Sequence, residues 1–376
     1  MRFQGFTIPW TEIEIGKAFQ VTRGYVLPAT VVRQDASEEY IYPVYSSQTK
    51  DNGLMGYYND YLYENAITWT TDGANAGTVH YRSGKFYCTN VCGVLLSDEG
   101  NANRCVAEIL GSVSKKYVSY VGNPKLMNNV MSEIKIYVPT IAEQKKIDDF
   151  ISVIDHRIEK QHELIEYLKK YKRGLLDKLL EDNSSDANWH IVKLQDVANG
   201  FDYGMNSAAT TFDGVHKYIR ITDIDDDSRQ YLSDNIVSPS DTPEEKYRVY
   251  DNDILFARTG ASVGKSYLYT PEDGELYFAG FLIRISVKKE YNSYFVYLNT
   301  LTSKYEKWLR LESMRSGQPG VNAEQYRNYA FRCPDYQTQV KIASIIKGID
   351  LRISKERMSL SKLNSLKNGL LQQLFI

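Results

Sequence analysis

"PTIAEQKKIDDFISVIDHRIEKQHELIEYLKKYKRGLLDKLLE", residues 139–181, is followed later in the chain by "PDYQTQVKIASIIKGIDLRISKERMSLSKLNSLKNGLLQQLFI", residues 334–376. A constant shift of 195 positions (334 − 139) aligns the two segments without a gap. The identities include Pro139 with Pro334, Gln144 with Gln339, Lys146 with Lys341, Asp155 with Asp350, Arg157 with Arg352, Lys172 with Lys367, and the Gly-Leu-Leu at 174–176 and 369–371. Self-similarity of this kind indicates a chain built from two related units.

Both repeated segments have the periodicity of long helices. Apolar residues recur in alternating steps of four and three, which predicts a seam with the 3.5-residue period of a coiled coil. The seam is interrupted at the same two places in both copies, at Gln161 and Lys172 in the first and at Glu356 and Lys367 in the second. Its apolar members are Ile147, Ile151, Ile154, Ile158, Ile165, Leu168, Leu175, Leu179, Ile342, Ile346, Ile349, Ile353, Leu360, Leu363, Leu370 and Leu374.

The two seams predict that the helices pair with each other, because both seams are narrow and have the same phase. The alternative is two separate amphipathic helices, each lying on its own domain. Pairing of two equivalent units favours a two-fold relation, and therefore antiparallel helices. Pro139 and Pro334 suit the entry to a helix, where a missing N–H costs nothing.

The rest of the chain predicts two variable domains of mixed α/β (α+β) class. The similarity between the copies extends to "WTEIEIGKAF" (10–19) and "WHIVKLQDVA" (189–198). Strand-like stretches such as "NDILFAR" (252–258) alternate with helical ones such as "NSYFVYLNTLTSKYEKWLR" (292–310). The expected layout is a variable domain at 1–138, a helix at 139–181, a linker at 182–188, a variable domain at 189–333 and a helix at 334–376.

A glycine motif occurs once in each variable domain. The stretch "ARTGASVGKSYLY" (257–269) contains Gly-Lys-Ser at 264–266, which is how a phosphate-binding loop ends. The G-x-x-x-x-G-K-[ST] pattern of such loops requires a glycine at position 259, where this chain has Thr259. The first domain has "TTDGANAGTVHY" (70–81), which has no lysine at that place. The shared feature is therefore a turn of small residues between strands, where a backbone can approach a partner closely. An ATP site stays the weaker interpretation.

Composition excludes several classes of protein. The 376 residues are 43% apolar and 24% charged with a net charge of −2, which is typical of globular proteins. No apolar run approaches a membrane span and "MRFQGFTIPW" has no signal-peptide pattern, so a cytoplasmic protein is expected. The four cysteines predict buried free thiols rather than a disulfide framework or zinc site. The acidic "DIDDD" (223–227) is expected to be a solvated loop rather than a metal site.

With these motifs, the whole chain resembles the specificity (DNA-recognition) subunit of Type I restriction-modification systems. The most specific parts of the resemblance are the duplicated helices, "KYIRITDI" (217–224), "DILFARTGASVGKSYL" (253–268), "PVYSSQTKDNGLMGYYNDY" (43–61) and "SGQPGVNAEQYRNYAFRCP" (316–334). One departure is Thr338, where the family motif usually has a glutamate, as at Glu143.

The resemblance implies two target-recognition domains, each reading one half of a bipartite site in double-stranded DNA. It implies that the paired helices set the length of the unread spacer and dock the methyltransferase (modification) subunits, of which two are expected. A restriction/translocase subunit is a further implied partner. The resemblance assigns S-adenosylmethionine, ATP and Mg to those partner subunits, so no cofactor, no metal and no catalytic residue is expected in this chain, and no membrane partner.

The candidates for DNA contact lie around the glycine turns and neighbouring loops, where basic and amide side chains can reach phosphates or base edges. They are Lys50, Asn75, Arg82, Lys85, Asn123, Arg258, Lys265, Arg315 and Gln318. Two other functions compete with DNA recognition: a nucleotide-dependent enzyme that uses Gly260–Ser266, and a coiled-coil assembly protein without a DNA role.

Overall fold

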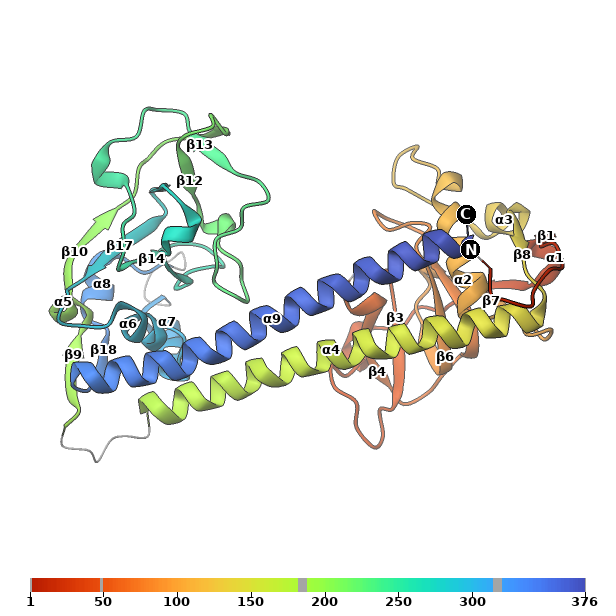
Figure 1. Cartoon of the computed structure of the whole chain (residues 1–376), viewed down its shortest axis with the longest axis horizontal. Helices are drawn as coiled ribbons and strands as arrows, with labels where there is room; N and C mark the ends of the chain where they lie inside the picture. The colour runs from red at the N-terminus through yellow and green to blue at the C-terminus, as the bar shows by residue number, and fades with distance from the viewer. Residues whose placement is uncertain (1, 48–49, 182–187, 314–319, 376) are drawn as a thin grey trace. The chain divides into compact units, whose positions relative to one another are not determined.

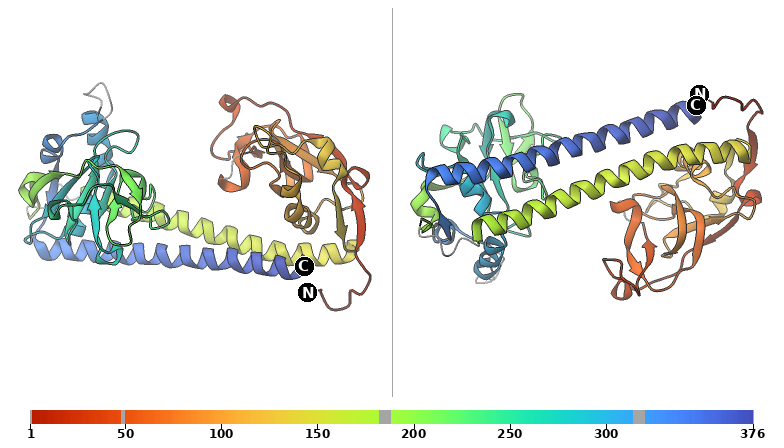
Figure 2. Two further views of the ribbon diagram at one scale, coloured as in Figure 1. Left: turned by 90° about the horizontal axis from the view of Figure 1, so that it is seen from above. Right: turned by 60° about the horizontal axis from the view of Figure 1, so that its bottom comes forward.

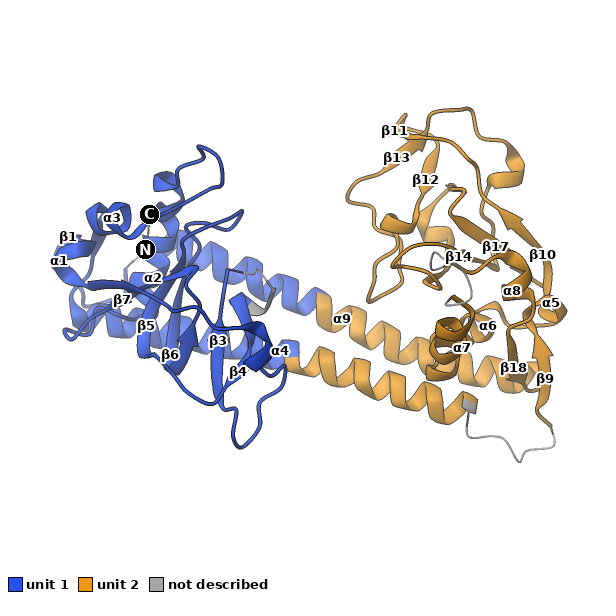
Figure 3. Cartoon of the chain, turned by 180° about the vertical axis from the view of Figure 1, so that it is seen from behind, with its two compact units in different colours: residues 1–162, 358–376 blue, residues 163–357 orange. Residues whose placement is uncertain are grey.

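A computed structural model describes residues 2–47, 50–181, 188–313 and 320–375 of the chain. The polypeptide divides into two compact units: residues 1–162 with 358–376, and residues 163–357 (Figure 3). Each unit therefore contains a globular part together with half of each long helix. The domain boundaries expected from the sequence follow chain order, and they stay a prediction.

The first unit is built on a six-stranded sheet with strand order β2-β7-β5-β6-β3-β4. Its strands are β2 (Gln20–Arg23), β3 (Tyr42–Tyr45), β4 (Leu54–Tyr58), β5 (Tyr63–Thr70), β6 (Val79–Cys88) and β7 (Cys92–Leu96). A separate antiparallel pair joins β1 (Thr11–Glu14) to β8 (Lys135–Val138). The helices are α1 (Ile15–Ala18), α2 (Arg104–Ser114) and α3 (Asn128–Glu133). α2 covers the sheet through buried Val106, Ile109 and Leu110.

The second unit has a four-stranded antiparallel sheet in the order β10-β17-β14-β15 and three two-stranded pairs, β11-β13, β12-β16 and β18-β9. The strands are β9 (His190–Lys193), β10 (Ala198–Tyr203), β11 (Ala209–Thr211), β12 (Lys217–Ile219), β13 (Val237–Pro239), β14 (Asp253–Ala257), β15 (Ser266–Leu268), β16 (Leu276–Phe278), β17 (Leu282–Val287) and β18 (Ala330–Cys333). The short helices are α5 (Leu194–Val197), α6 (Ser293–Asn299), α7 (Ser303–Ser313) and α8 (Ala323–Arg327).

The two units repeat one strand plan with a local difference. In each unit a parallel pair joins a strand that precedes the glycine motif to a strand that follows it. The pairs are β3 with β6 and β12 with β16. After the glycine motif, the second unit has two separate strands, β15 and β16, whereas the first has the single continuous strand β6. Gly84 lies in β6 at φ +69°, and its N–H donates to Asn65 Oδ1 at 2.8 Å, so the strand absorbs the irregularity as a bulge.

The long helices are α4 (Ile141–Glu181) and α9 (Tyr336–Phe375), and the prediction that they pair is confirmed (Figure 1). In the first unit, Ile147 and Ile151 of α4 share one core cluster with Leu374 of α9. In the second, Leu176 and Leu180 share a cluster with Ile342 and Ile346, and Figure 2 shows the end of α4 beside the beginning of α9. The start of each helix meets the end of the other within a unit, so the helices are antiparallel.

Every predicted seam residue is buried or half-buried. The seam is wider than predicted, because Leu176 and Leu180 are 2% and 4% exposed whereas their seam neighbours Leu175 and Leu179 are only half-buried. These extra residues pack into the core of the second unit. Each helix therefore contacts both its mate and the globular part of its own unit.

Equivalent side chains anchor the beginning of each long helix. Gln144 Nε2 donates to the Pro139 carbonyl at 2.9 Å, and Gln339 Nε2 donates to the Pro334 carbonyl at 2.9 Å. The side-chain oxygen of each glutamine accepts a hydrogen bond from the residue that caps a helix in the globular part. Gln144 Oε1 accepts from Asn103, the N-cap of α2, and Gln339 Oε1 accepts from the N–H of Asn292, the N-cap of α6. The repeat identity Gln144/Gln339 thus fixes each helix to its own globular part.

The departure at Thr338 has a local explanation. Glu143 is 1% exposed, and its carboxylate accepts from Arg2 Nε at 3.0 Å and Arg2 Nη2 at 2.6 Å. Thr338 instead donates its hydroxyl to Asp335 at the entry of α9. A buried carboxylate needs a paired cation, so the glutamate is useful where the N-terminal arm supplies Arg2.

Candidate nucleic-acid interface

The glycine motif forms the same turn in both units. Gly73 and Gly77 have φ of +91° and +82°, and Gly260 and Gly264 have φ of +75° and +81°. The Gly77 N–H donates to Thr70 O at 2.9 Å, and the Gly264 N–H donates to Ala257 O at 2.8 Å. This left-handed geometry favours glycine, and the turn closes a strand pair. The turn interpretation of the motif is the one that the geometry supports.

The two glycines of each turn have different surroundings. A Cβ on Gly264 would lie 2.1 Å from Leu309 Cδ2, and a Cβ on Gly77 would lie 2.8 Å from Val118 Cγ2. A Cβ on Gly73 or Gly260 would meet nothing within 4 Å. The second glycine therefore allows internal packing, and the first leaves its backbone open to an outside partner.

In the first unit, a small polar cavity of about 150 Å³ lies beside the turn. Its lining includes His80 and Arg82 of β6, Thr78 directly before that strand, and Asn75 of the turn itself. Burial, with the charges of Arg82 and Lys367, lowers the pKa of His80 to about 4. Two of the predicted contact residues, Asn75 and Arg82, therefore lie at one site.

Arg82 is held in place by its own unit. It is 8% exposed, its guanidinium lies 3.7 Å from the centre of the Tyr45 ring, and it donates to Thr68 Oγ1 at 3.1 Å and to the Asn52 carbonyl at 2.7 Å. Asn75 donates to the Ser47 carbonyl at 3.2 Å. Both side chains thus connect the sheet to the segment around residues 46–53.

The other candidates of the first unit lie apart from that cavity. Lys50 begins a short 3₁₀ helix, Lys50–Gly53, and its side chain is outside the described part of the structure. Lys85 is exposed, with its ammonium 4.4 Å from the centre of the Tyr61 ring. Asn123 is exposed. It lies beside the glycine turn, since the Gly73 N–H donates to the carbonyl of its neighbour Pro124 at 2.9 Å.

In the second unit, Lys265 is the basic residue of the turn, and it is 6% exposed. Its Nζ donates to the Ile224 carbonyl at 2.9 Å and forms an ion pair with Asp226, whose pKa is lowered by that contact. Lys265 therefore connects the sheet to the loop at 223–232, as Arg82 connects the sheet to the segment at 46–53. A lysine with these partners does not have the free ammonium that a phosphate-binding loop presents.

Arg258, on the other side of the turn, is half-buried. Its Nε donates to the Gly280 carbonyl at 3.0 Å, and its guanidinium lies 5.1 Å from the Tyr203 ring centre and 5.9 Å from that of Phe281. Arg315 and Gln318 lie outside the described residues.

A larger cavity of about 1390 Å³ lies within the second unit. The turn and the loop at 223–232 line one part of it, and the facing halves of α4 and α9 line another through Glu166, Lys169, Arg173, Lys347 and Arg357. Arg229 and Tyr231 also line it, and Arg229 has the uncommon φ of +60°. Sequence patterns did not single out these residues, because their proximity depends on how the loop folds back onto the helices.

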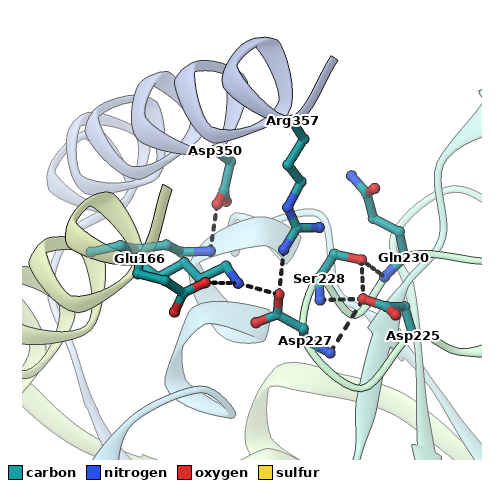
Figure 4. Close-up of polar contacts among 9 residues, drawn as sticks. Glu166, Asp225, Asp227, Ser228, Gln230, Asp350 and Arg357 are labelled. Carbon is teal, nitrogen blue, oxygen red and sulfur yellow. Dashed lines mark hydrogen bonds and ion pairs between the residues drawn. The ribbon is translucent and has the colours of Figure 1, made fainter. Parts of the chain in front are cut away.

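Asp227 joins this loop to both helices (Figure 4). Its carboxylate accepts from Lys169 of α4 at 2.6 Å and forms a second ion pair with Arg357 of α9. Burial alone would lower the pKa of Lys169, but the bonds to Asp227 and Glu166 outweigh it, and the pKa is raised. Next to this contact, Lys172 of α4 lies 2.6 Å from Asp350 of α9.

The expectation that residues 223–227 form a solvated loop holds for Asp226 and Asp227, which are exposed, but not for Asp223 and Ile224, which are buried. Asp223 accepts from Arg220, Asp225 accepts from Ser228, and Asp226 and Asp227 pair with lysine and arginine side chains. The pairing places the acidic run between a sheet and a helix pair. The structure does not support the alternative of a metal site, since no three His, Cys, Asp or Glu side chains lie close enough together to hold a metal ion among the residues described.

Two further sequence expectations meet the structure here. The four cysteines are buried free thiols, as predicted, and burial raises the pKa of Cys92 to about 11. No helix in the described ranges is both long enough and apolar enough to cross a lipid bilayer.

Comparison with known proteins gives one consistent result. The family model of the Type I restriction modification DNA specificity domain matches residues 8–170 and again 186–364. A putative type I specificity subunit of Mycoplasma pneumoniae is 34% identical over 154 residues, which cover 40% of this chain and 49% of that protein. A second one from the same organism is 28% identical over 326 residues, covering 82% and 83%. The chain thus spans about half of the first relative and most of the second.

The fold has the same relatives. The crystal structure of the S subunit of a type I restriction-modification system from M. genitalium superposes with a TM-score of 0.60 at 17% identity, covering 100% of this chain and 97% of that one. At this identity the match concerns the fold alone, two mixed α/β parts with two long helices in contact. Because the family model matches twice and covers most of the sequence, the chain belongs to the Type I restriction modification DNA specificity domain family.

Proposed function

We propose that this chain is the DNA-recognition subunit of a type I restriction-modification complex. Residues 1–138 and 189–333 are the two target-recognition domains, and each reads one half of a bipartite site in double-stranded DNA. The paired helices set the length of the spacer and dock two methyltransferase subunits, which in turn recruit a restriction/translocase subunit. The chain performs no catalysis in this proposal, and S-adenosylmethionine, ATP and Mg belong to its partners.

One observation supports the bipartite reading most directly. Lys172 pairs with Asp350 in the second unit, and their repeat equivalents Lys367 and Asp155 pair in the first. The same pair of side chains therefore joins the two long helices in each unit, as expected for a chain built from two related copies. Two related units in one chain suit the two half-sites of a bipartite site.

The recognition surfaces have the composition of a nucleic-acid contact. Next to each glycine turn, an arginine is stacked on tyrosine, Arg82 on Tyr45 and Arg258 on Tyr203. Exposed Lys85 and Asn123 extend the surface of the first unit. Within such a surface, side chains that are fixed by their own unit serve to position the loops, and exposed ones reach phosphates or base edges.

The decisive experiment is co-expression of the chain with a type I methyltransferase subunit and mapping of modified adenines across a genome. Modified adenines confined to one bipartite motif support the proposal. A complex that forms but modifies no defined motif contradicts the recognition role and favours an assembly protein. Saturable ATP binding by the isolated chain that Lys265→Ala abolishes would instead favour a nucleotide-dependent enzyme.

A further inference from the structure

Five charged side chains are buried within the described parts of the chain, and four of them are paired with an opposite charge. The pairs are Glu143 with Arg2, Asp223 with Arg220, Asp253 with Arg284, and Lys265 with Asp226. The fifth is Arg82, which is 8% exposed and forms no ion pair with a described carboxylate. A buried charge is costly unless an opposite charge offsets it. Arg82 therefore lacks the counter-charge that the other four have.

The groups around Arg82 are neutral. Its guanidinium stacks on the Tyr45 ring and donates to a hydroxyl and to a backbone carbonyl. Burial lowers the pKa of Arg82, and the side chains that oppose this are chiefly Tyr45, Cys92 and Cys88. Burial raises the pKa of all three, so they are uncharged near pH 7. The contacts hold the guanidinium in place but leave its charge uncompensated.

The polar cavity of the first unit lies against this cation, and none of the described residues that line it is acidic. Thr70, Thr78 and His80 also line it, and their side chains form no hydrogen bond within the described residues. Thr70 is 7% exposed. Buried polar groups are normally hydrogen-bonded, so polar side chains without a partner beside an unpaired cation indicate a missing ligand.

The volume and the lining suit one small anion. A cavity of about 150 Å³ can hold a molecule of benzene, which is larger than a tetrahedral oxoanion such as phosphate. Arginine binds phosphate oxygens through its fork of N–H groups, and threonine hydroxyls can donate one hydrogen bond each. With a pKa of about 4, His80 is neutral near pH 7, and its ring can donate a further bond.

The second unit shows how a buried cation beside the glycine turn is satisfied when the chain supplies the anion. Lys265 is 6% exposed, and its counter-charge is Asp226 of the loop at 223–232. In the first unit, the segment around residues 46–53 contacts Arg82 through the Asn52 carbonyl. A carbonyl oxygen carries only a partial charge, so an anion from outside the chain would complete the site.

We infer that this cavity binds a phosphate-class oxoanion, held by Arg82 together with Thr70, Thr78 and His80. Two sources share that chemistry: a free phosphate ion and a backbone phosphate of DNA. Asn75 of the glycine turn lines the same cavity, so the site lies beside the proposed recognition surface. The DNA source rests on the proposed function, whereas the binding of free phosphate does not.

The first arm of the test uses inorganic phosphate and the full chain. Thermal unfolding is followed as phosphate replaces chloride at constant pH and ionic strength, and the affinity is measured by calorimetric titration. The wild type is expected to show a saturable rise in melting temperature, because a ligand that binds only the folded state stabilises it. Arg82→Gln is expected to abolish the rise. Lys17→Gln removes an exposed cation of the same unit and, as the matched control, should keep it.

A second variant separates binding from folding, since Arg82→Gln also removes contacts within the unit. Thr70→Val with Thr78→Val deletes two hydroxyls, and valine has nearly the shape of threonine and suits a strand. This variant is expected to fold and to bind phosphate about tenfold or more weakly, because hydrogen bonds to a charged ligand are strong. Unchanged phosphate affinity in this variant would overturn the inference.

The second arm distinguishes the two sources. Binding of a DNA duplex of arbitrary sequence to the full chain is measured at several salt concentrations. If a DNA phosphate occupies the cavity, Arg82→Gln should lower the slope of log affinity against log salt by about one, and inorganic phosphate should compete with the duplex. Saturable phosphate binding with an unchanged slope assigns the site to free phosphate. A chain that binds no DNA in any complex contradicts the proposed function and leaves the phosphate arm intact.

Two results would overturn the oxoanion site. The first is a wild type that phosphate does not stabilise, together with an unchanged salt slope, which would mean that the cavity holds water only. The second concerns Asp51, the one acidic residue at 46–53. If Asp51→Asn destabilises the chain and phosphate has no effect on the wild type, the chain itself supplies the counter-charge of Arg82.

Discussion

Lys172 Nζ lies 2.6 Å from Asp350 Oδ1, and Lys367 Nζ, its equivalent in the repeat, lies 2.9 Å from Asp155 Oδ1. Lysine in an apolar seam is unfavourable unless it is paired, and here the pairing explains why both seams are interrupted at this place. Lys367 also contacts Glu108 of α2 at 3.0 Å. Burial alone would lower the pKa of Lys367, but the two carboxylates outweigh it and raise the pKa.

The first prediction concerns this pair. Lys172→Met and Asp350→Asn should each lower the free energy of unfolding, and the double variant should lose less than the sum, with a coupling of about 1 kcal/mol. Urea titration of the four proteins measures the cycle. Exposed Lys178→Met on the same helix serves as the control, and additive effects of the two changes would show that the contact contributes nothing.

The second prediction concerns Asp227. Asp227→Asn removes the charge that Lys169 and Arg357 share, so the loop at 223–232 should exchange its amide hydrogens faster. The effect should shrink at high salt, because the Asp227 side chain is 52% exposed and salt screens such pairs. Hydrogen exchange followed by mass spectrometry checks this. Asp234→Asn, an exposed carboxylate close by in the chain, is the matched control and should leave the loop unchanged.

The third prediction ranks four glycines. Gly264→Ala should be the most destabilising, then Gly77→Ala, because both add a clash to a strained φ. Gly73→Ala and Gly260→Ala add only the strain of a positive φ, about 1 kcal/mol each. Thermal unfolding measures the order. Equal effects at all four sites would mean that Val118 and Leu309 move aside without cost.

The fourth prediction concerns pH. The pKa of His80 is about 4 when folded, below its ordinary value of 6.5, so the unfolded chain binds a proton in this window that the folded chain does not. His80 therefore adds no penalty above about pH 6.5 and destabilises the fold progressively as the pH falls to 4, by up to about 3 kcal/mol. Denaturation at several pH values should show a shallower dependence for His80→Gln. An identical profile in the variant would assign the dependence to other groups.

The sequence predicted the long helices and their pairing because a 3.5-residue apolar period is a local signal that repeats over many turns. It predicted β14 almost to the residue, because a run of apolar, β-branched and aromatic residues is also a local signal. The single helix expected at 292–310 is two helices, α6 and α7. The Thr300 hydroxyl donates to the Tyr297 carbonyl where α6 ends, and the Thr302 hydroxyl accepts from the Tyr305 N–H where α7 begins. Single hydrogen bonds of threonine hydroxyls give too weak a sequence pattern to predict such a break.

The site was harder to predict than the fold. The glycine turn emerged from comparison of the two copies, but the roles of Arg82 and Lys265 did not. Lys265 meets Asp226, and Arg82 meets Asn52, across 39 and 30 positions of the chain (265 − 226 and 82 − 52). Such contacts depend on how a loop packs back on a sheet, which no local pattern encodes. The ion pairs of Asp226 and Asp227 were not predicted for the same reason.

The anchors Gln144 and Gln339 have a consequence for how such chains change over generations. Each glutamine holds its helix through a backbone carbonyl and a helix cap, and neither contact involves the exposed side chains around the glycine turns. Recombination that replaces one variable segment between these fixed points keeps the junction with the helix. If the chain has the proposed function, one genetic exchange can therefore give a lineage a new target preference, while the helix pair stays unchanged.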